Sequence, residues 1–272
     1  MCMKRLISID KLNGLSGKEW IKFTKSWFVL NPTPRNVKIC HPASFPEELA
    51  EPFINFFTKI GDWVVDPFAG SGSTLIAARR LGRNSWGMEL YEKYVELTRR
   101  RLSEIEEGGV DSIMINGDSR NILKIRKRLN IPLADFCITS PPYWNQLKRN
   151  TERQVLRTEK QLDCIYGKNQ SDLGMIDDYN EFLEQQMLIF DNLREVMKSG
   201  AYLVVITNNV YADGRLWPLA FDTLKMLSEK WVPKDEKIWC QDNRKLFPFG
   251  MFHSYIGNRS HHYCLVFRKD YS

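Results

Sequence analysis

The sequence lacks the features of membrane and exported proteins. No apolar run approaches the roughly 20 residues that a membrane-spanning helix needs. Residues 1–12 mix polar and apolar side chains and contain no apolar core of the kind found in a signal peptide. We therefore expect a cytoplasmic protein without a membrane partner.

Metal-binding patterns are missing as well. None of the six cysteines forms a C-x-x-C pair, and none stands at a zinc-like spacing from the four histidines. His261 and His262 are adjacent and lead into a predicted strand, where neighbouring side chains face opposite ways and cannot bind one ion. Cys137 and Cys264 lie within apolar strand patterns and are expected to be reduced core residues. The sequence predicts no metal site.

The common phosphate-binding loops are also absent. The chain has a glycine-rich loop from Asp66 to Thr74, but it matches neither G-x-G-x-x-G nor the P-loop ending in Gly-Lys-Ser/Thr. Asp66 adds negative charge where an anion would bind, so the loop favours a zwitterion or a cation. An amino-acid ammonium or a sulfonium cofactor meets that demand. Gly70 and Gly72 allow the backbone to approach such a ligand closely.

The composition is that of an ordinary soluble domain, with 272 residues, 43% hydrophobic and 26% charged. The net charge of +6 is compatible with a polyanionic partner. Predicted strands at 63–66, 84–88, 113–115, 134–139 and 201–207 alternate with predicted helices at 46–58, 74–81, 91–107, 121–129, 178–198 and 216–229. This alternation predicts an α/β fold with a mainly parallel, doubly wound, Rossmann-like sheet. We expect a single domain over residues 1–272.

The two ends of the chain complete this prediction. Residues 1–36 are expected to be a helical lead-in. Within it Ser16 and Glu19 form a capping box, and the helix that it opens is predicted to carry Trp20, Phe23, Trp27 and Phe28 on one face. Strands at 237–241 and 262–268 are predicted to form an antiparallel pair.

Acidic residues follow successive predicted strands. Asp66 ends the first strand, Glu89 the second and Asp118 the third. In nucleotide-binding α/β folds an acid in the position of Glu89 hydrogen-bonds ribose hydroxyls. Asp118 is placed to accept from an adenine amino group. Three such acids around one glycine loop predict a nucleoside-containing ligand.

The stretch Thr139-Ser140-Pro141-Pro142-Tyr143-Trp144 follows the fourth predicted strand. Two prolines remove two backbone donors and end the strand. The result is a stiff tip that carries a hydroxyl and two aromatic rings, at the sheet edge where ligands bind in open α/β folds.

The two motifs together resemble those of the S-adenosylmethionine-dependent DNA amino-methyltransferases, over roughly residues 37–209. Residues 66–74 look like the cofactor loop of that family, and residues 139–144 look like its catalytic motif in the Ser-Pro-Pro-Tyr form of the cytosine-N4 enzymes. Residues 41–49 resemble the segment that covers the methionine end of the cofactor. The cofactor loop precedes the catalytic motif, whereas a loop of this kind usually follows it.

The resemblance implies S-adenosyl-L-methionine as cofactor. The implied cofactor-binding residues are Pro42, Phe45, Asp66, Phe68, Gly70, Ser71, Gly72, Thr74, Glu89, Asp118 and Thr139. The implied catalytic residues are Ser140, Pro141, Pro142 and Tyr143.

An exocyclic cytosine amine is a poor nucleophile because its lone pair is delocalised into the ring. Ser140 Oγ and the Pro141 carbonyl are predicted to accept its two hydrogens and free that lone pair, while Tyr143 stacks on the base. The chain has no Pro-Cys loop of the kind that carbon-5 methylation requires.

A duplex hides the target amine, so the base must be flipped out. Trp144, Lys148 and Arg149 are expected to contact the nucleic acid, and residues 145–176 and 210–260 are candidate recognition segments. DNA is the expected partner. Three alternatives remain: a cytosine in structured RNA such as ribosomal RNA, adenine N6 in DNA, and a non-catalytic nucleic-acid-binding module.

Overall fold

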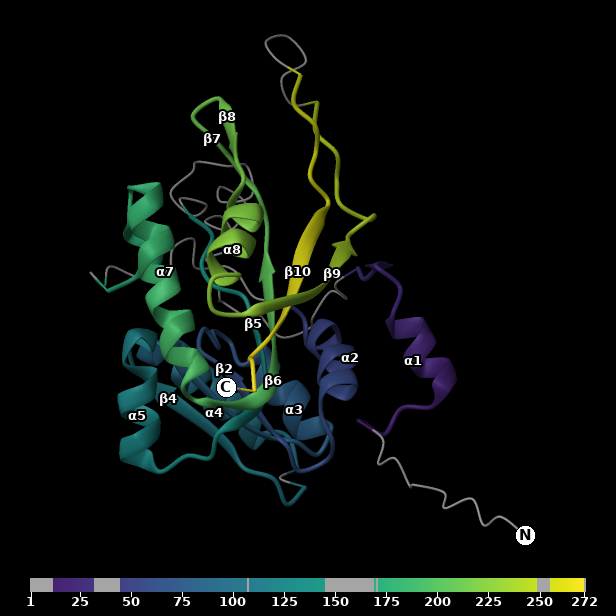
Figure 1. Cartoon of the computed structure of the whole chain (residues 1–272), viewed down its shortest axis with the longest axis vertical. Coiled ribbons are helices and arrows are strands. Elements are labelled where there is room, and N and C mark those ends of the chain that lie inside the picture. The colour runs from purple at the N-terminus through teal and green to yellow at the C-terminus, as the bar shows by residue number, and fades with distance from the viewer. Residues whose placement is uncertain are drawn as a thin grey trace.

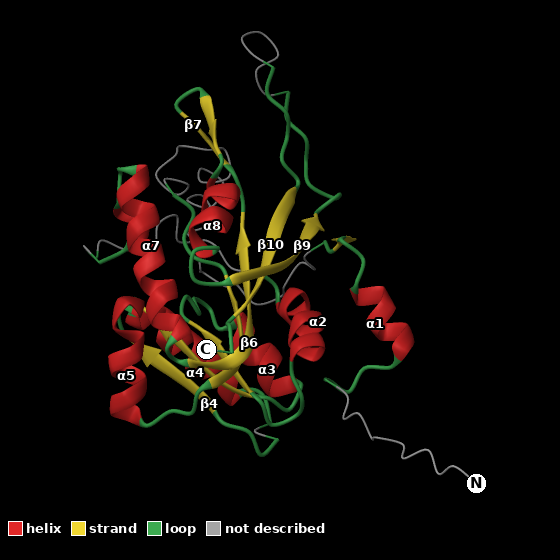
Figure 2. Ribbon diagram, viewed as in Figure 1, coloured by secondary structure: helices red, strands yellow, loops and turns green. Residues whose placement is uncertain are grey.

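The computed structural model describes residues 12–31, 45–106, 108–144, 169, 171–248 and 255–271. Within these ranges eight strands form one sheet in the order β1-β9-β10-β6-β5-β2-β3-β4 (Figure 2). In that order their bounds are Trp27–Val29, Val232–Cys240, His261–Arg268, Met197–Thr207, Ala134–Thr139, Trp63–Asp66, Asn84–Glu89 and Ser112–Asn116. Strands β6, β5, β2, β3 and β4 are parallel, and β10 is antiparallel to both β6 and β9. The predicted fold class is confirmed.

Helices cover both faces of this sheet (Figure 1). The helices on one face are α1, α2, α3 and α4, with bounds Gly17–Phe23, Glu47–Phe57, Ser73–Arg80 and Glu92–Ser103. Those on the other face are α5, α7 and α8, with bounds Ile122–Leu129, Tyr179–Arg194 and Leu219–Leu227. Two short 3-10 helices, η1 at Ser119–Asn121 and η2 at Leu173–Met175, follow strand β4 and precede α7.

The central strands are buried on both sides, because successive side chains point to opposite faces of a strand. In β6, Leu203 and Val205 pack with Phe190 of α7, whereas Val204 and Ile206 pack with Phe53 of α2. All six of these side chains are at most 1% exposed. The carboxyl ends of the central strands therefore stand on a closely packed core.

Three helix predictions are corrected by the structure. Helix α1 ends at Phe23, and Trp27 with Phe28 lies in β1, which pairs in parallel with β9. The second helix was predicted to continue to residue 198, but helix α7 ends at Arg194. Met197 already pairs with Ala134 as the first residue of β6. Gly200, two residues after the end of the predicted helix, has a φ of 77° and lies within β6.

The third correction concerns the stretch before α8. Leu216 and Trp217, predicted to be helical, belong to strand β8 (Arg215–Trp217), which forms a hairpin with β7 (Val210–Ala212). Asp213 and Gly214 both have positive φ, as a tight hairpin turn requires. Helix α8 begins only after Pro218.

Two further predictions are confirmed, and one lies mostly outside the described residues. The capping box of Ser16 and Glu19 is present, and strands 237–241 and 262–268 do pair antiparallel within β9 and β10. The predicted recognition segment 145–176 lies mostly outside the described residues. Among the helices that the structure describes, none has the length and apolar character needed to cross a membrane.

The aromatic side chain of Phe136 in β5 provides a test of the core. It is fully buried and stacks on Phe57 with ring centroids 5.1 Å apart. We expect Phe136→Ala to lower the free energy of unfolding by about 3–5 kcal/mol, since it removes contacts and leaves a cavity. Urea denaturation measures this loss. Leu246→Ala, at a side chain that is 69% exposed, is the control and should change stability by less than about 0.5 kcal/mol. Equal effects would contradict the described packing.

Candidate functional site

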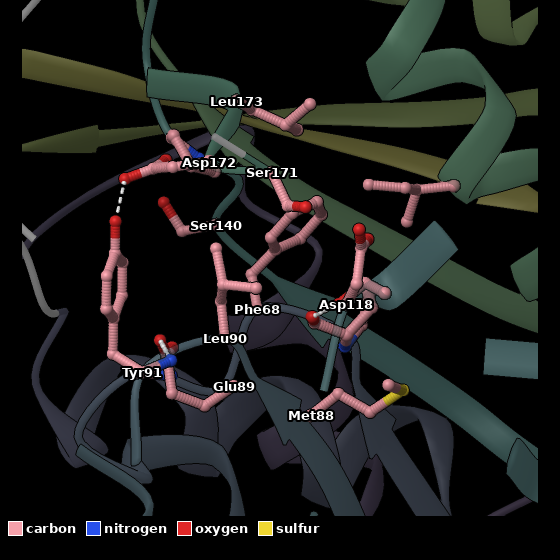
Figure 3. A pocket seen from close by; sticks show the side chains of 15 residues that line it. Phe68, Met88, Glu89, Leu90, Tyr91, Asp118, Ser140, Ser171, Asp172 and Leu173 are labelled. Carbon is pink, nitrogen blue, oxygen red and sulfur yellow. Dashed lines mark hydrogen bonds between the residues drawn. The ribbon is translucent and has the colours of Figure 1, made fainter. Parts of the chain in front are cut away.

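A cavity that is open to solvent lies beyond the carboxyl ends of four parallel strands. Its lining includes Phe68 and Gly70 after β2, Glu89 and Leu90 at the end of β3, Asp118 and Ser119 after β4, and Ser140 and Pro142 after β5. Figure 3 shows the Ser140 side chain in the same cavity as those of Glu89 and Asp118. The structure therefore brings the glycine loop, two strand-end acids and the Ser-Pro-Pro-Tyr motif to one place.

Residues 171–173 cover this cavity from the opposite side. Ser171, Asp172 and Leu173 line it, and Asp172 caps the short helix η2 through the Gly174 N–H. The Tyr91 hydroxyl donates to Asp172 Oδ2 at 2.8 Å, so the start of α4 is tied to this cover (Figure 3). Neither Tyr91 nor Asp172 is part of a motif that the sequence reveals.

Asp66 is buried below the cavity and is not among its lining residues. Its carboxylate accepts from Thr74 Oγ1 at 2.6 Å, Thr139 Oγ1 at 2.5 Å and the Phe68 N–H at 2.9 Å. Burial raises the pKa of Asp66 to about 6, and the three hydrogen bonds oppose that rise. Asp66 thus joins the tips of β2 and β5 to helix α3. Direct contacts of Asp66, Thr74 and Thr139 with the cofactor stay predictions.

The glycine loop has the backbone geometry that its sequence predicts. Gly70 and Gly72 have φ angles of 52° and 81°, which favour glycine. Thr98 of α4 donates to the Gly70 carbonyl at 3.1 Å and packs so closely that a β-carbon at Gly72 would collide with its methyl group. Tight packing therefore fixes this loop before any ligand binds.

The loop is anchored to α2 at its other end. Phe45 lies in the core beside α2, and its carbonyl accepts from Ser73 Oγ at 2.7 Å. The Ser71 carbonyl accepts from Arg101, which also pairs with the buried Glu47. The Ser71 hydroxyl is buried and has no hydrogen-bond partner among the described residues. Contacts of Phe45 and Ser71 with the cofactor stay predictions.

Glu89 is held at the mouth of the loop by backbone donors. Its Oε2 accepts from the Gly70 N–H at 3.1 Å and its Oε1 from the Tyr91 N–H at 2.9 Å. Burial raises the pKa of Glu89 to about 7, and these hydrogen bonds lower it. Each carboxylate oxygen keeps one lone pair for a further donor, which is what a ribose diol requires.

The carboxylate of Asp118 is paired with an arginine, a contact that the sequence does not predict. It forms an ion pair with Arg120 at 2.6 Å and accepts the Arg120 N–H at 2.9 Å. Arg120 also donates to the Ser171 carbonyl and to Gln185 of α7, each at 3.0 Å. Arg120 therefore links the end of β4 to the cavity cover and to α7. The adenine contact of Asp118 stays a prediction.

Some residues of the Ser-Pro-Pro-Tyr-Trp stretch line the cavity, and the others pack against neighbouring elements. Ser140 and Pro142 line the cavity, while Pro141 is buried. Tyr143 Oη lies 3.2 Å from His262 Nδ1 of β10. Trp144 is 4% exposed, donates to the Asp177 carbonyl at 3.0 Å and packs on Tyr179 and Trp217. Trp144 thus supports the β7–β8 hairpin, and its contact with nucleic acid stays a prediction.

Three predicted contacts, those of Pro42, Lys148 and Arg149, lie outside the described residues. The sequence gives no signal for three further residues of the site, Tyr91, Asp172 and Arg120. Each hydrogen-bonds to a partner that is distant in the chain.

The chemistry of the cavity lining is compatible with the predicted cofactor, whose contacts here stay predictions. Glu89 offers free lone pairs for ribose hydroxyls, Gly70 brings backbone to the lining, and Phe68 with Leu90 provides apolar surface. Among the described residues, no group of three or more His, Cys, Asp and Glu side chains is placed to hold a metal ion.

Gly72 allows a matched test of the loop. Gly72→Ala should destabilise the chain, because the new β-carbon meets Thr98 in a backbone conformation that already disfavours alanine. It should also weaken S-adenosylmethionine binding, measured by calorimetry. Gly61→Ala is the control: its φ is 84° and no heavy atom lies within 4 Å of the added carbon. Loss of cofactor affinity in both variants, or in neither, would contradict the loop's role.

The raised pKa values of Glu89 and Asp66 predict that the stability of the fold depends on pH. Its pKa rises from 4.5 to about 7 and that of Asp66 from 3.8 to about 6, so the unfolded chain releases both protons at lower pH than the folded chain. The free energy of unfolding should therefore fall as the pH rises from about 4 to 7. Glu89→Gln should make that fall shallower in urea denaturation at pH 5, 6, 7 and 8. Glu92→Gln, at an exposed side chain, should leave the slope unchanged.

Comparison with curated proteins identifies several short regions of similarity. The Type II methyltransferase M.MthZI of Methanothermobacter thermautotrophicus is 48% identical over 62 residues, which are 23% of this chain and 18% of that protein. M2.DpnII of Streptococcus pneumoniae is 43% identical over 67 residues, 25% of each chain. M.HinfI of Haemophilus influenzae is 35% identical over 99 residues, 36% of this chain and 24% of that protein. The matches span about a quarter or less of the length of these relatives.

Solved structures show the same fold. TrmN from Thermus thermophilus superposes with a TM-score of 0.52 and 14% identity, over 82% of this chain and 48% of that one. The DNA methylase family profile matches residues 9–100 and 134–272, which include both the glycine loop and the Ser-Pro-Pro-Tyr motif. The chain therefore belongs to the DNA methylase family, whose cofactor is S-adenosylmethionine.

Proposed function

We propose that this chain transfers a methyl group from S-adenosylmethionine to the exocyclic N4 amine of cytosine in DNA. One observation carries the proposal: Ser140 of the Ser-Pro-Pro-Tyr motif and Glu89 at the end of β3 line the same cavity. A methyl donor held at Glu89 and an amine held at Ser140 would then share one cavity. Family membership and the relatives named as Type II methyltransferases support DNA as the substrate.

The residues of the chain act on the amine by accepting hydrogen bonds. S-adenosylmethionine, when bound, supplies a methyl group on a positively charged sulfur. Ser140 Oγ and the Pro141 carbonyl accept the two amine hydrogens, which frees the nitrogen lone pair from the ring. They also stabilise the positive charge that develops on the nitrogen as the methyl carbon passes to it from the sulfur, and the nitrogen then loses one hydrogen as a proton to solvent. Pro141 and Pro142 fix the backbone of this acceptor pair, so little reorganisation is needed during transfer.

Tyr143 provides the stacking surface for the base. Burial raises the pKa of its hydroxyl, so the ring stays neutral at physiological pH. The side chain is partly buried among the aromatic cluster of Trp144 and Trp217. A base that stacks on Tyr143 must leave the duplex, since the motif stands at the strand tips and beside the cavity.

Two alternatives differ in the substrate. Adenine N6 is the other target within this family, and Ser at the first position of the motif favours cytosine over it. A cytosine in structured RNA would require the same acceptors. Mass spectrometry of digested nucleic acid separates all three. We expect N4-methylcytosine in DNA incubated with the protein and cofactor. N6-methyladenine, or methylation confined to RNA, would replace the proposed substrate, and no methylated base in either would refute the activity.

Variants of the motif test the roles of its residues. Ser140→Ala and Tyr143→Ala should lower turnover by roughly 100-fold or more, because the amine loses an acceptor or the base loses its stacking partner. Cofactor affinity, measured by calorimetry, should change little. Ser103→Ala, an exposed serine at the end of α4, is the control and should retain full turnover. Parallel loss of cofactor affinity and turnover would show that the motif holds the cofactor instead.

A further inference from the structure

His262 connects the catalytic motif to a distant part of the chain. Its Nδ1 lies 3.2 Å from Tyr143 Oη, and its Nε2 lies 3.2 Å from Arg244 Nη2. Arg244 Nη1 in turn donates to the Arg259 carbonyl at 3.4 Å. A continuous line of hydrogen bonds therefore runs from the segment after β9, through β10, to the tyrosine of the Ser-Pro-Pro-Tyr motif.

The chemistry of arginine fixes the direction of this line. A guanidinium group has only donors, so His262 Nε2 must accept and cannot carry a hydrogen. The neutral imidazole then carries its hydrogen on Nδ1. Nδ1–H donates to Tyr143 Oη, which leaves the tyrosine its own O–H for a further acceptor. A doubly protonated His262 would place two donors face to face and would break the line at Arg244.

The imidazole is held rigidly enough to orient its partner. His262 pairs with Trp239 across β10 and β9, and the two rings stack with centroids 4.7 Å apart and planes 26° from parallel. Trp239 is 4% exposed, and its Nε1 donates to the Leu30 carbonyl at 2.8 Å. Pro141 and Pro142 have fixed φ angles and restrict the backbone that leads to Tyr143. The hydroxyl contact to His262 adds a restraint at the far end of the tyrosine ring.

We propose that His262, held by Arg244, is a positioning residue that fixes the plane of the Tyr143 ring for stacking of the target base. The proposal rests on the proposed function, since it assigns a role in that reaction to residues outside both sequence motifs. His262 itself does not touch the reacting atoms. Its role is to limit the angles at which the base can stand beside Ser140, which matters because small misplacements of a substrate slow a transfer strongly.

The tautomer provides a test that does not depend on activity. Nitrogen-15 NMR of the histidine rings, assigned with His→Gln variants, should show His262 as the Nδ1–H tautomer in the full chain. Arg244→Met removes the donor to Nε2 and should shift His262 towards the Nε2–H form. An Nε2–H or doubly protonated His262 in the wild-type protein would overturn the proposal.

A double-mutant cycle tests the positioning role. His262→Ala and Tyr143→Phe should each lower kcat on DNA on the order of tenfold with little change in cofactor affinity. The double variant should lose no more than the more affected single variant, because both changes remove the same hydrogen bond. His262→Asn keeps a donor near the Nδ1 position and should recover part of the loss. His261→Ala, the neighbour on the opposite side of β10, is the control and should keep the wild-type kcat.

The outcomes separate the two proposals. Multiplicative losses in the double variant, or an equal loss in His261→Ala, would overturn the positioning role while leaving the proposed function intact. A wild-type protein that methylates no nucleic acid would overturn the proposed function and the positioning role with it, and the NMR result would still decide the hydrogen-bond direction.

Discussion

One buried carboxylate holds the two halves of the site in register. Asp66 is the last residue of β2. Its carboxylate oxygens accept hydrogen bonds from the side chains of Thr74 in α3 and Thr139 in β5 and from the Phe68 N–H. The glycine loop therefore cannot move away from the Ser-Pro-Pro-Tyr motif without leaving a buried carboxylate unsatisfied, which is costly. Glu89, Gly70 and Ser140 reach one cavity because this anchor fixes the strand tips beneath them.

Much of this site could be predicted from the sequence, because its main parts are local. The glycine loop, Glu89 and Ser140 each stand directly after a strand, and parallel strands bring their carboxyl ends to one edge. The contacts of Arg120 with Ser171 and of Tyr91 with Asp172 could not be predicted, since they join residues 51 and 81 positions apart. His262 was considered only as a metal ligand, and its pairing with Tyr143 depends on how β10 lies relative to β5 and β6.

The fold shows the same division. The alternation of strands and helices predicts the parallel sheet, but the local structure at two glycines does not follow from that alternation. Gly200 has the positive φ of a helix end, yet it lies within β6, where the Tyr271 ring packs against it. Asp213-Gly214 is a strong hairpin signal, and in the structure it outweighs the helical pattern that begins at Leu216. Strand β1 was missed because three residues show too little periodicity and depend on pairing with β9.

The pairing of β2 with β5 also sets the order in which the molecule can assemble. Asp66 and Thr139 are 73 residues apart in the chain, so the site requires a long loop to close before its two motifs meet. Loops of that length close late, after local helices and turns have formed. A partly folded chain would therefore hold both motifs yet bind no nucleoside, and a ligand of this cavity would stabilise only the completed sheet.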